Sequence, residues 1–267
     1  GAWLYGGRKQ QGADHPRRYL IASGLVMGLA WLTKTPSILL VPTGFLLILA
    51  EWWRRRTHAD AQPPALSLSQ MALGYVVWGL IASAVFVLLW PAMWVDPLGT
   101  FGRMAAEMTS YVESHVNPNY FMGEVTNDPG IFFYPIAWLF RTTPLTLIGL
   151  VAGAATAWRR RAPFDQLNAR RLSQALLLYA LIFTVTLTLT AKKFDRYLLP
   201  AFVALDLVAV LGWVGLADWV RDWWTRRRGL SRPATPMVAT SVLSVAVLLH
   251  GLLGFAHFPY YFTYYNP

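Results

Sequence analysis

Residues Met71–Trp90 read MALGYVVWGLIASAVFVLLW. This stretch contains no charged side chain, and a run of about 20 mostly apolar residues is what an α-helix needs to cross the hydrocarbon core of a bilayer. Three further segments are mostly apolar and of similar length: Leu172–Ala191, Leu198–Val220 and Met237–Phe255. The sequence therefore predicts an all-α fold, a polytopic transmembrane helix bundle, with residues 1–267 forming one transmembrane domain.

A fifth apolar segment, Ile131–Trp158, is longer and contains Pro135 and Pro144. Proline removes a backbone donor and bends or ends a helix. We expect an interfacial segment at Ile131–Phe140, a break over residues 141–144, and then a span. One continuous helix kinked at proline is the alternative interpretation.

Two shorter apolar segments, Tyr19–Leu32 and Pro36–Trp53, are separated only by the three residues around Lys34. The first has 14 residues, or roughly 21 Å of helix, against a hydrocarbon core of about 30 Å. We therefore expect the turn that carries Lys34 to lie below the membrane surface. With this pair, the predicted bundle has about seven spans.

Positive charge is distributed unequally between the loops that these spans define. The chain has 23 Lys and Arg residues and a formal net charge of +10. Alternate loops hold 17 of these cations, in clusters such as Arg54–Arg56 and Arg159–Arg161, and the other loops hold six. Since positively charged loops stay in the cytoplasm, the six remaining cations should face outward from a plasma membrane. The basic clusters are then topology signals, and nucleic acid is not an expected partner.

Composition also excludes several kinds of chemistry. The chain has no Cys, so it has neither a thiolate nucleophile nor a Cys-based metal site. His250 and His257 have no second ligand at a useful spacing, and no metal or other cofactor is predicted. Asp206 falls within a span, where we expect it to be paired inside the bundle. The first residues, Gly1–Tyr5, read as the end of a span, so we expect a fragment of a longer protein.

The longest outer loop, residues 91–130, is rich in aromatic side chains and Met. Loops of this length are usually functional or disordered, and this composition disfavours disorder. Asp96 and Pro97 resemble a helix start, and Arg103 should contact lipid headgroups from the helix that follows. The next apolar residues recur at helical spacing and predict an amphipathic helix along the membrane surface; they are Leu98, Phe101, Met104, Ala105, Met108, Tyr111 and Val112.

The segment after this helix, His115–Glu124, reads HVNPNYFMGE and is dense in hydrogen-bonding and stacking groups. His115 and Asn117 can bond sugar hydroxyls, and Tyr120 can stack on a sugar ring. An ordinary turn rich in Asn, Pro and Gly is an equally good interpretation.

Five cations at the outer surface form the second candidate site. Arginine binds phosphate with two parallel hydrogen bonds, and lysine acts as a point charge. Lipid headgroups are the alternative anion, because long basic side chains at helix ends often reach the interface. Asp195 is expected to hold Arg196 in place. The five candidates are Lys34, Arg141, Lys192, Lys193 and Arg196.

Three stretches together resemble a known family. They are Gly28–Pro36 (GLAWLTKTP), the segment from His115 to Gly123 that leads to Arg141–Pro144 (RTTP), and Lys192–Pro200 (KKFDRYLLP). The chain resembles the membrane glycosyltransferases of the GT-C class, and is most similar to the bacterial protein O-mannosyltransferase and aminoarabinose-transferase-like group, family 39 of the glycosyltransferases. The resemblance covers residues from about 20 to 265.

The resemblance implies an enzyme that takes a sugar from a polyprenyl-phosphate carrier and transfers it to a protein or glycolipid acceptor at the outer face of the membrane. Lys34, Arg141 and Arg196 would bind the carrier phosphate. His115, Asn117 and Tyr120 would line the cavity near the sugar or acceptor. The family's general base is an acidic residue in the first outer loop, which has no matching position in this chain. Lys192, Lys193 and Tyr197 complete the candidate binding residues.

Other interpretations stay open. A base within this chain would be Glu113, Glu124 or Asp128. A transporter or flippase of lipid-linked substrates would explain Asp206 and the Thr residues at alternate positions of residues 184–190, although alternate residues do not share one helical face. A non-catalytic membrane subunit is the third class.

Overall fold

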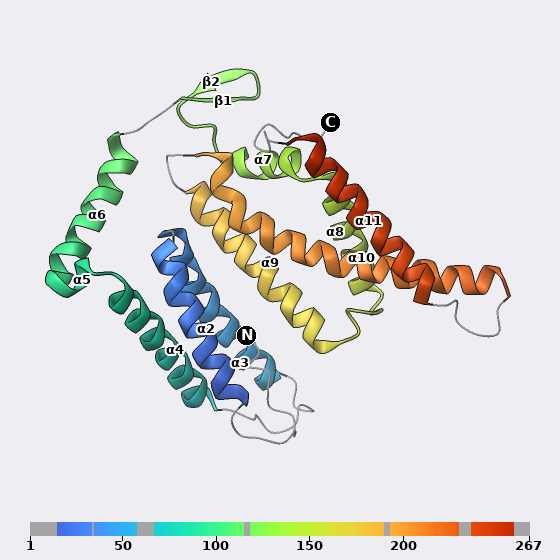
Figure 1. Ribbon diagram of the computed structural model, residues 1–267, viewed down its shortest axis with the longest axis horizontal. Coiled ribbons are helices and arrows are strands. Elements are labelled where there is room, and N and C mark those ends of the chain that lie inside the picture. The colour runs from blue at the N-terminus through green and yellow to red at the C-terminus, as the bar shows by residue number, and fades with distance from the viewer. Residues whose placement is uncertain are drawn as a thin grey trace. The chain divides into compact units, whose positions relative to one another are not determined.

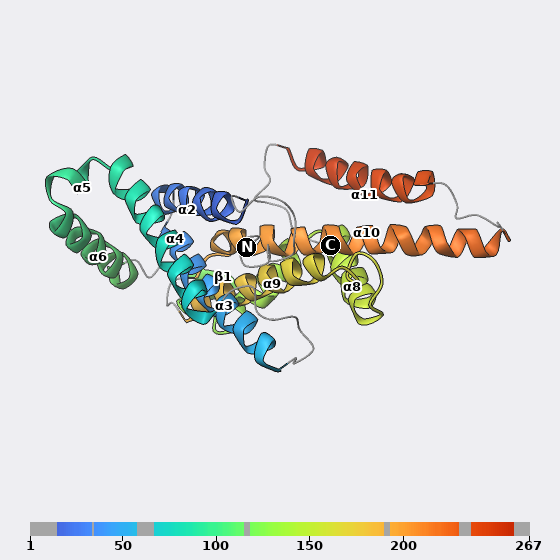
Figure 2. The same cartoon turned by 90° about the horizontal axis from the view of Figure 1, so that it is seen from below.

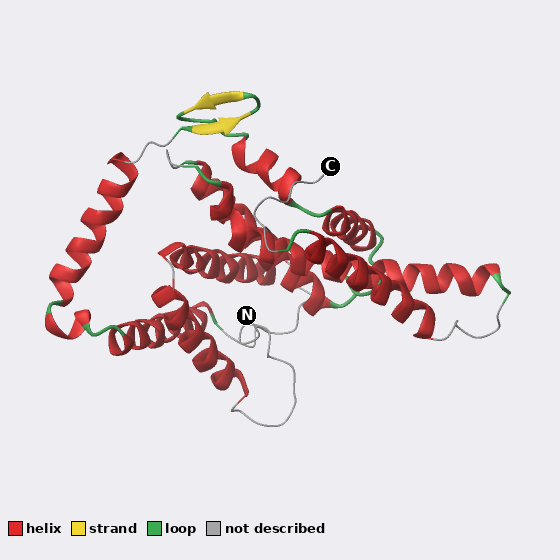
Figure 3. Cartoon of the chain, turned by 45° about the horizontal axis from the view of Figure 1, so that its top comes forward, coloured by secondary structure: helices red, strands yellow, loops and turns green. Residues whose placement is uncertain are grey.

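The computed structural model is almost entirely helical, and its only described strands form one short hairpin (Figures 1 and 3). This confirms the all-α prediction. The chain divides into two compact units, Gly1–His115 and Val116–Pro267. The structure describes residues 15–33, 35–57, 67–114, 118–189, 193–229 and 236–258.

Four of the predicted spans are confirmed by length and composition. They are α4 (Leu68–Leu89), α9 (Leu167–Thr188), the continuous segment Asp195–Arg227, and Met237–Ala256 within α11. A fifth is present if the bent pair α7 and α8 counts as one span. The described residues thus provide four or five helices able to cross a membrane, which indicates a membrane protein.

The described part of unit 1 starts with α2 (His15–Thr33), the 3-10 turn η1 (Thr35–Leu39) and α3 (Leu40–Thr57). These helices contain the two predicted short spans. Neither is among the four helices that are long and apolar enough to cross a membrane. α2 packs closely on α4, because a Cβ at Gly28 would lie only 2.6 Å from the carbonyl oxygen of Ala82. Small residues at helix crossings permit such close approach of two backbones.

The long loop of unit 1 contains α5 (Ala92–Val95) and α6 (Pro97–Ser114). The predicted helix start is confirmed, since the Asp96 carboxylate accepts a 2.9 Å hydrogen bond from the backbone N–H of Gly99. Arg103, expected at lipid headgroups, forms a 3.3 Å ion pair with Asp96. Leu98 and Phe101 on α6 are exposed, as expected of a helix with an apolar membrane-facing side.

Unit 2 begins with an antiparallel hairpin of β1 (Asn119–Phe121) and β2 (Glu124–Thr126). Met122 and Gly123 form its turn with φ values of 54° and 92°, a backbone region that glycine adopts readily. Successive strand side chains point to opposite faces. The Phe121 ring packs on Phe133 at 5.3 Å between centroids, whereas Tyr120 is exposed.

The predicted break over residues 141–144 is confirmed. α7 (Phe133–Arg141) and α8 (Pro144–Trp158) meet at 107°, so they are two helices rather than one kinked helix. Thr143 caps α8, because its hydroxyl accepts from the backbone N–H of Thr146 at 3.3 Å. Pro144 occupies the first turn, where a missing backbone donor costs nothing.

The core of unit 2 is α10 (Leu199–Arg227), which packs against α8, α9 and α11 (Pro236–Ala256) (Figure 2). Its closest neighbour is α8. A Cβ at Gly212 would lie 1.8 Å from the carbonyl oxygen of Gly149, so only glycine fits at this crossing. The Trp213 indole donates a 2.9 Å hydrogen bond to the carbonyl oxygen of Leu145 and links the two helices again.

Candidate functional site

The two ends of unit 2 differ in charge. α8 and α10 run in the same direction, because Thr146 contacts Asp206 near their starts and Thr156 lies against Gly215 further along. α9 connects the end of α8 to the start of α10 and runs in the opposite direction. The end where α8 and α10 begin carries three of the predicted cations, Arg141, Lys193 and Arg196. The opposite end carries an arginine cluster made of Arg159, Arg160, Arg161, Arg170, Arg171, Arg226, Arg227 and Arg228.

The first cation of this group, Arg141, is the last residue of α7. Its guanidinium forms an ion pair with Asp195 at the start of η2 (Asp195–Leu198), and the two side chains are 16% and 31% exposed. The other carboxylate oxygen of Asp195 accepts a 2.7 Å hydrogen bond from the backbone N–H of Arg196. Asp195 therefore holds the backbone of Arg196, as expected, and also fixes the side chain of Arg141.

The second cation, Lys193, is almost completely buried. Its ammonium donates a 2.5 Å hydrogen bond to Asp128, and the side chains are 4% and 67% exposed. The same oxygen of Asp128 accepts from the backbone N–H of Gly130 at 3.0 Å. The Lys193 hydrogen bond, followed by that from Gly130, lowers the pKa of the Asp128 carboxyl below its ordinary value. A carboxyl with a lowered pKa is a weaker general base, which argues against Asp128 as the catalytic base.

The third cation, Arg196, is exposed and is positioned by aromatic rings. Its guanidinium carbon lies 4.6 Å from the centroid of the Phe194 ring and 5.8 Å from that of Tyr197. Stacking on a ring face holds an arginine while its N–H groups remain able to donate in the guanidinium plane. The structure pairs Arg196 with no carboxylate side chain among the described residues. Of the three cations, Arg196 is therefore the one best placed to bind an external anion.

One residue of this end was not predicted. Tyr134 on α7 is fully buried against Phe133, with ring centroids 5.1 Å apart, and lies within electrostatic range of Asp195 and Tyr197. The aromatic residues of Ile131–Phe140 were interpreted together as interfacial. Nothing in their spacing distinguishes the side chain that faces the cation group.

The remaining described candidates take no part in the contacts given above. Tyr120 and Glu124 are exposed on the hairpin, and Glu113 is part of α6 in unit 1, where its side chain is not described. In the described part of the chain, no three His, Asp or Glu side chains lie close enough together to hold a metal ion. Four candidates lie outside the described residues: Lys34, His115, Asn117 and Lys192.

A second polar group lies within the helices of unit 2. The Thr146 hydroxyl donates a 3.0 Å hydrogen bond to Asp206 on α10, and His250 on α11 acts electrostatically on the same carboxyl. Asp206 is therefore partnered inside the bundle, as expected. The hydroxyls of Thr184 and Thr188 donate to backbone carbonyls of their own helix, so these two Thr residues offer no polar path along α9.

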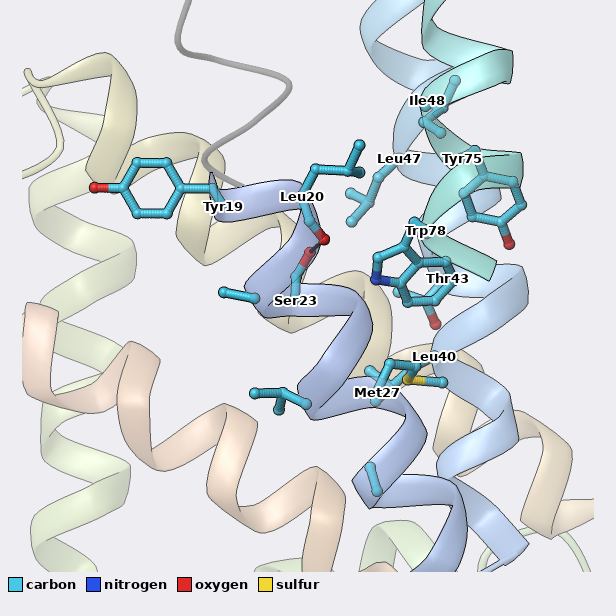
Figure 4. A pocket seen from close by; sticks show the side chains of 15 residues that line it. Tyr19, Leu20, Ser23, Met27, Leu40, Thr43, Leu47, Ile48, Tyr75 and Trp78 are labelled. Carbon is cyan, nitrogen blue, oxygen red and sulfur yellow. Dashed lines mark hydrogen bonds between the residues drawn. The ribbon is translucent and has the colours of Figure 1, made fainter. Parts of the chain in front are cut away.

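Unit 1 contains an open apolar groove of about 530 Å³ between α2, α3 and α4. Figure 4 shows the side chains that line it, including Met27 from α2, Leu47 from α3 and Trp78 from α4. Tyr75 lies at its edge, and its hydroxyl donates a 2.6 Å hydrogen bond to the carbonyl oxygen of Val41. With few polar groups in its lining, the groove can accept a hydrocarbon chain but not a phosphate.

The cation group of unit 2 remains the candidate site for a charged substrate. Comparison of the chain with models of protein families, with curated proteins and with solved structures finds no match, so the inferred function depends on the residues described above.

Proposed function

We propose that the protein is an integral membrane glycosyltransferase, which moves a sugar from a polyprenyl-phosphate carrier to a protein or glycolipid acceptor at the extracytoplasmic face of the plasma membrane. The observation that carries the proposal is the group of Arg141, Lys193 and Arg196 at the end of unit 2 opposite its arginine cluster. Cations at the predicted outer end run against the usual charge bias of membrane proteins. A bound anion gives them a function.

The chemistry of such a transfer fits a fixed cation. The carrier phosphate is the leaving group, and negative charge accumulates on its oxygens as the bond to the sugar breaks. A preorganised guanidinium stabilises that charge more in the transition state than in the ground state. Arg196 is the strongest candidate for this role, because its side chain is exposed and positioned by Phe194, while Arg141 is held by Asp195.

The proposal also includes seven spans. α2 has 19 residues and contains the apolar segment Tyr19–Leu32, which is the first span of the proposal. With η1 and α3 as the next span and α7 with α8 as another, the spans number seven. The catalytic base is left unassigned.

Arg196 provides the test. Proteoliposomes would be supplied with a labelled polyprenyl-phosphate sugar, and transfer to acceptor would be followed. Removing one charge-stabilising donor costs about 10²–10³-fold in kcat, so we expect Arg196→Ala to lose activity on this scale and Arg196→Lys to retain part of it. The control is Arg103→Ala, which removes an exposed arginine already paired with Asp96 and should leave transfer unchanged. Equal rates for wild type and Arg196→Ala would remove the basis of the proposal.

A transporter of lipid-linked substrates is the second candidate, and one observation favours it. Asp206, Thr146 and His250 place ionisable and polar groups within the helices, where such residues often mark a transport path. Asp206→Asn separates the two functions, because the amide can still accept the Thr146 hydrogen bond but cannot carry charge. Under the transferase proposal this variant keeps sugar transfer. A transporter would lose substrate movement between leaflets, measured with a labelled lipid.

A further inference from the structure

The ion pair of Lys193 and Asp128 is unusual in the unequal burial of its partners. Lys193 is 4% exposed and Asp128 is 67% exposed. A buried ammonium requires a compensating anion, because taking an unpaired charge out of water is very costly. An exposed carboxylate can return to water at little cost. Loss of the contact would therefore cost much more free energy at the buried Lys193 than at the exposed Asp128.

Asp128 reaches Lys193 from a loop that is separate from the loop carrying Lys193. It follows β2 and precedes α7, 65 residues before its partner. Thr126 and Gly130 shape this loop, since the Asp128 backbone N–H donates to the Thr126 hydroxyl at 3.3 Å and the Gly130 N–H donates to the carboxylate. A single carboxylate oxygen thus receives both the ammonium and a backbone donor. This is the donor geometry that an anionic oxygen prefers.

We infer that Lys193 is an anion-binding site whose occupant in this structure is the chain's own Asp128, and that a phosphate group displaces Asp128 when it binds. The loop between β2 and α7, which carries Asp128, then acts as a strap that covers the site until a ligand arrives. The carboxylate and phosphate oxygens make the same contacts, so exchange leaves the buried ammonium compensated throughout. This inference relies on the proposed function only for the source of the phosphate, which is the lipid carrier or free phosphate.

A purely structural ion pair makes the opposite prediction for removal of the carboxylate. If Asp128 serves only to stabilise the fold, Asp128→Asn loosens the loop and gains no ligand. If Asp128 occupies a ligand site, Asp128→Asn removes a competitor. If Asp128 leaves Lys193 open for roughly 1–10% of the time, the apparent dissociation constant for phosphate is raised by the inverse of that fraction. Removing the Asp128 carboxylate should then tighten phosphate binding by about 10- to 100-fold.

The test measures binding of two probes, inorganic phosphate and a polyprenyl monophosphate, to the protein in nanodiscs. We expect Asp128→Asn to bind phosphate about 10- to 100-fold more tightly than wild type, and Lys193→Met to abolish this gain when combined with it. Asp96→Asn breaks an exposed ion pair in unit 1 and is the matched control, with unchanged affinity. Tighter binding of both probes identifies the phosphate group as the ligand; tighter binding of the lipid probe alone identifies the carrier.

Equal or weaker binding of both probes to Asp128→Asn would overturn the inference. Thermal unfolding of the same variants keeps that outcome interpretable, because phosphate should raise the midpoint of Asp128→Asn more than that of wild type if the variant is folded. The proposed function fails separately. Tighter phosphate binding in Asp128→Asn, with no sugar transfer by the wild type, would support the anion site at Lys193 and exclude the transferase function.

Discussion

The guanidinium of Arg141, at the end of α7, is bound to the carboxylate of Asp195, 54 residues later at the start of η2. This contact joins the bent α7–α8 segment to the beginning of α10. Asp195 also accepts from the backbone N–H of Arg196, so the ion pair sets the position of the residue proposed to bind phosphate.

We expect the Arg141–Asp195 pair to stabilise unit 2 measurably, because both side chains are partly buried. Contacting residues in one network show coupling energies of about 0.5–3 kcal/mol in double-mutant cycles. The cycle uses Arg141→Ala, Asp195→Ala and the double variant, and compares free energies of unfolding in detergent micelles. Additive effects of the two single changes would mean that the pair contributes nothing to stability.

The crossing of α8 and α10 gives a second prediction. Gly212→Val should destabilise the protein by about 3 kcal/mol, the upper end for overpacked sites, because the added Cβ would overlap the carbonyl oxygen of Gly149. Gly251→Val on α11 is the matched control, since a Cβ there has no atom within 4 Å. Unfolding of both variants followed by circular dichroism checks the difference. Similar losses of stability in the two variants would show that the helix propensity of valine, and not the α8–α10 crossing, causes the destabilisation.

The strap around Asp128 should respond to acid in a defined direction. The pKa of the Asp128 carboxyl lies below its ordinary value of 3.8. The contact with Lys193 is therefore fully present above pH 3.8, and it is lost as the pH falls through the lower pKa of the folded state. Because the chain has no Cys, a spin label at Val125→Cys on β2 would report hairpin mobility without interference. We expect mobility to rise only below about pH 4.

The same label in Asp128→Asn is the control for this titration. That variant lacks the titrating carboxyl, so its hairpin mobility should be independent of pH over the same range. A pH response of equal size in both proteins would assign the change to another group.

The parts of the fold that were predictable are those encoded by neighbouring residues. Apolar runs such as Met71–Trp90 identify spans, and Thr143 with Pro144 marks the start of α8, because helix caps and proline act within one turn. Asp96 and Pro97 identify the start of α6 in the same way. These signals require no knowledge of the tertiary structure.

The contacts of the candidate site were not predictable in this way. Lys193 was expected to face a ligand directly, yet it is buried under Asp128, and that burial depends on a loop 65 residues away. The two three-residue strands are too short to show the alternation that identifies a strand. The basic residues were found because charge is rare in this chain, whereas their acidic partners depend on how the helix ends meet.

In the proposed topology, the end of unit 2 with Arg141, Lys193 and Arg196 lies outside the cell. Single cysteines in this cysteine-free chain allow a direct measurement, with Val125→Cys on the hairpin and Arg228→Cys beyond α10 as the two positions. A membrane-impermeant maleimide applied to intact cells should label Val125→Cys, and should label Arg228→Cys only after permeabilisation. Labelling of Arg228→Cys in intact cells, with Val125→Cys protected, would place the cation group in the cytoplasm and overturn the proposed topology.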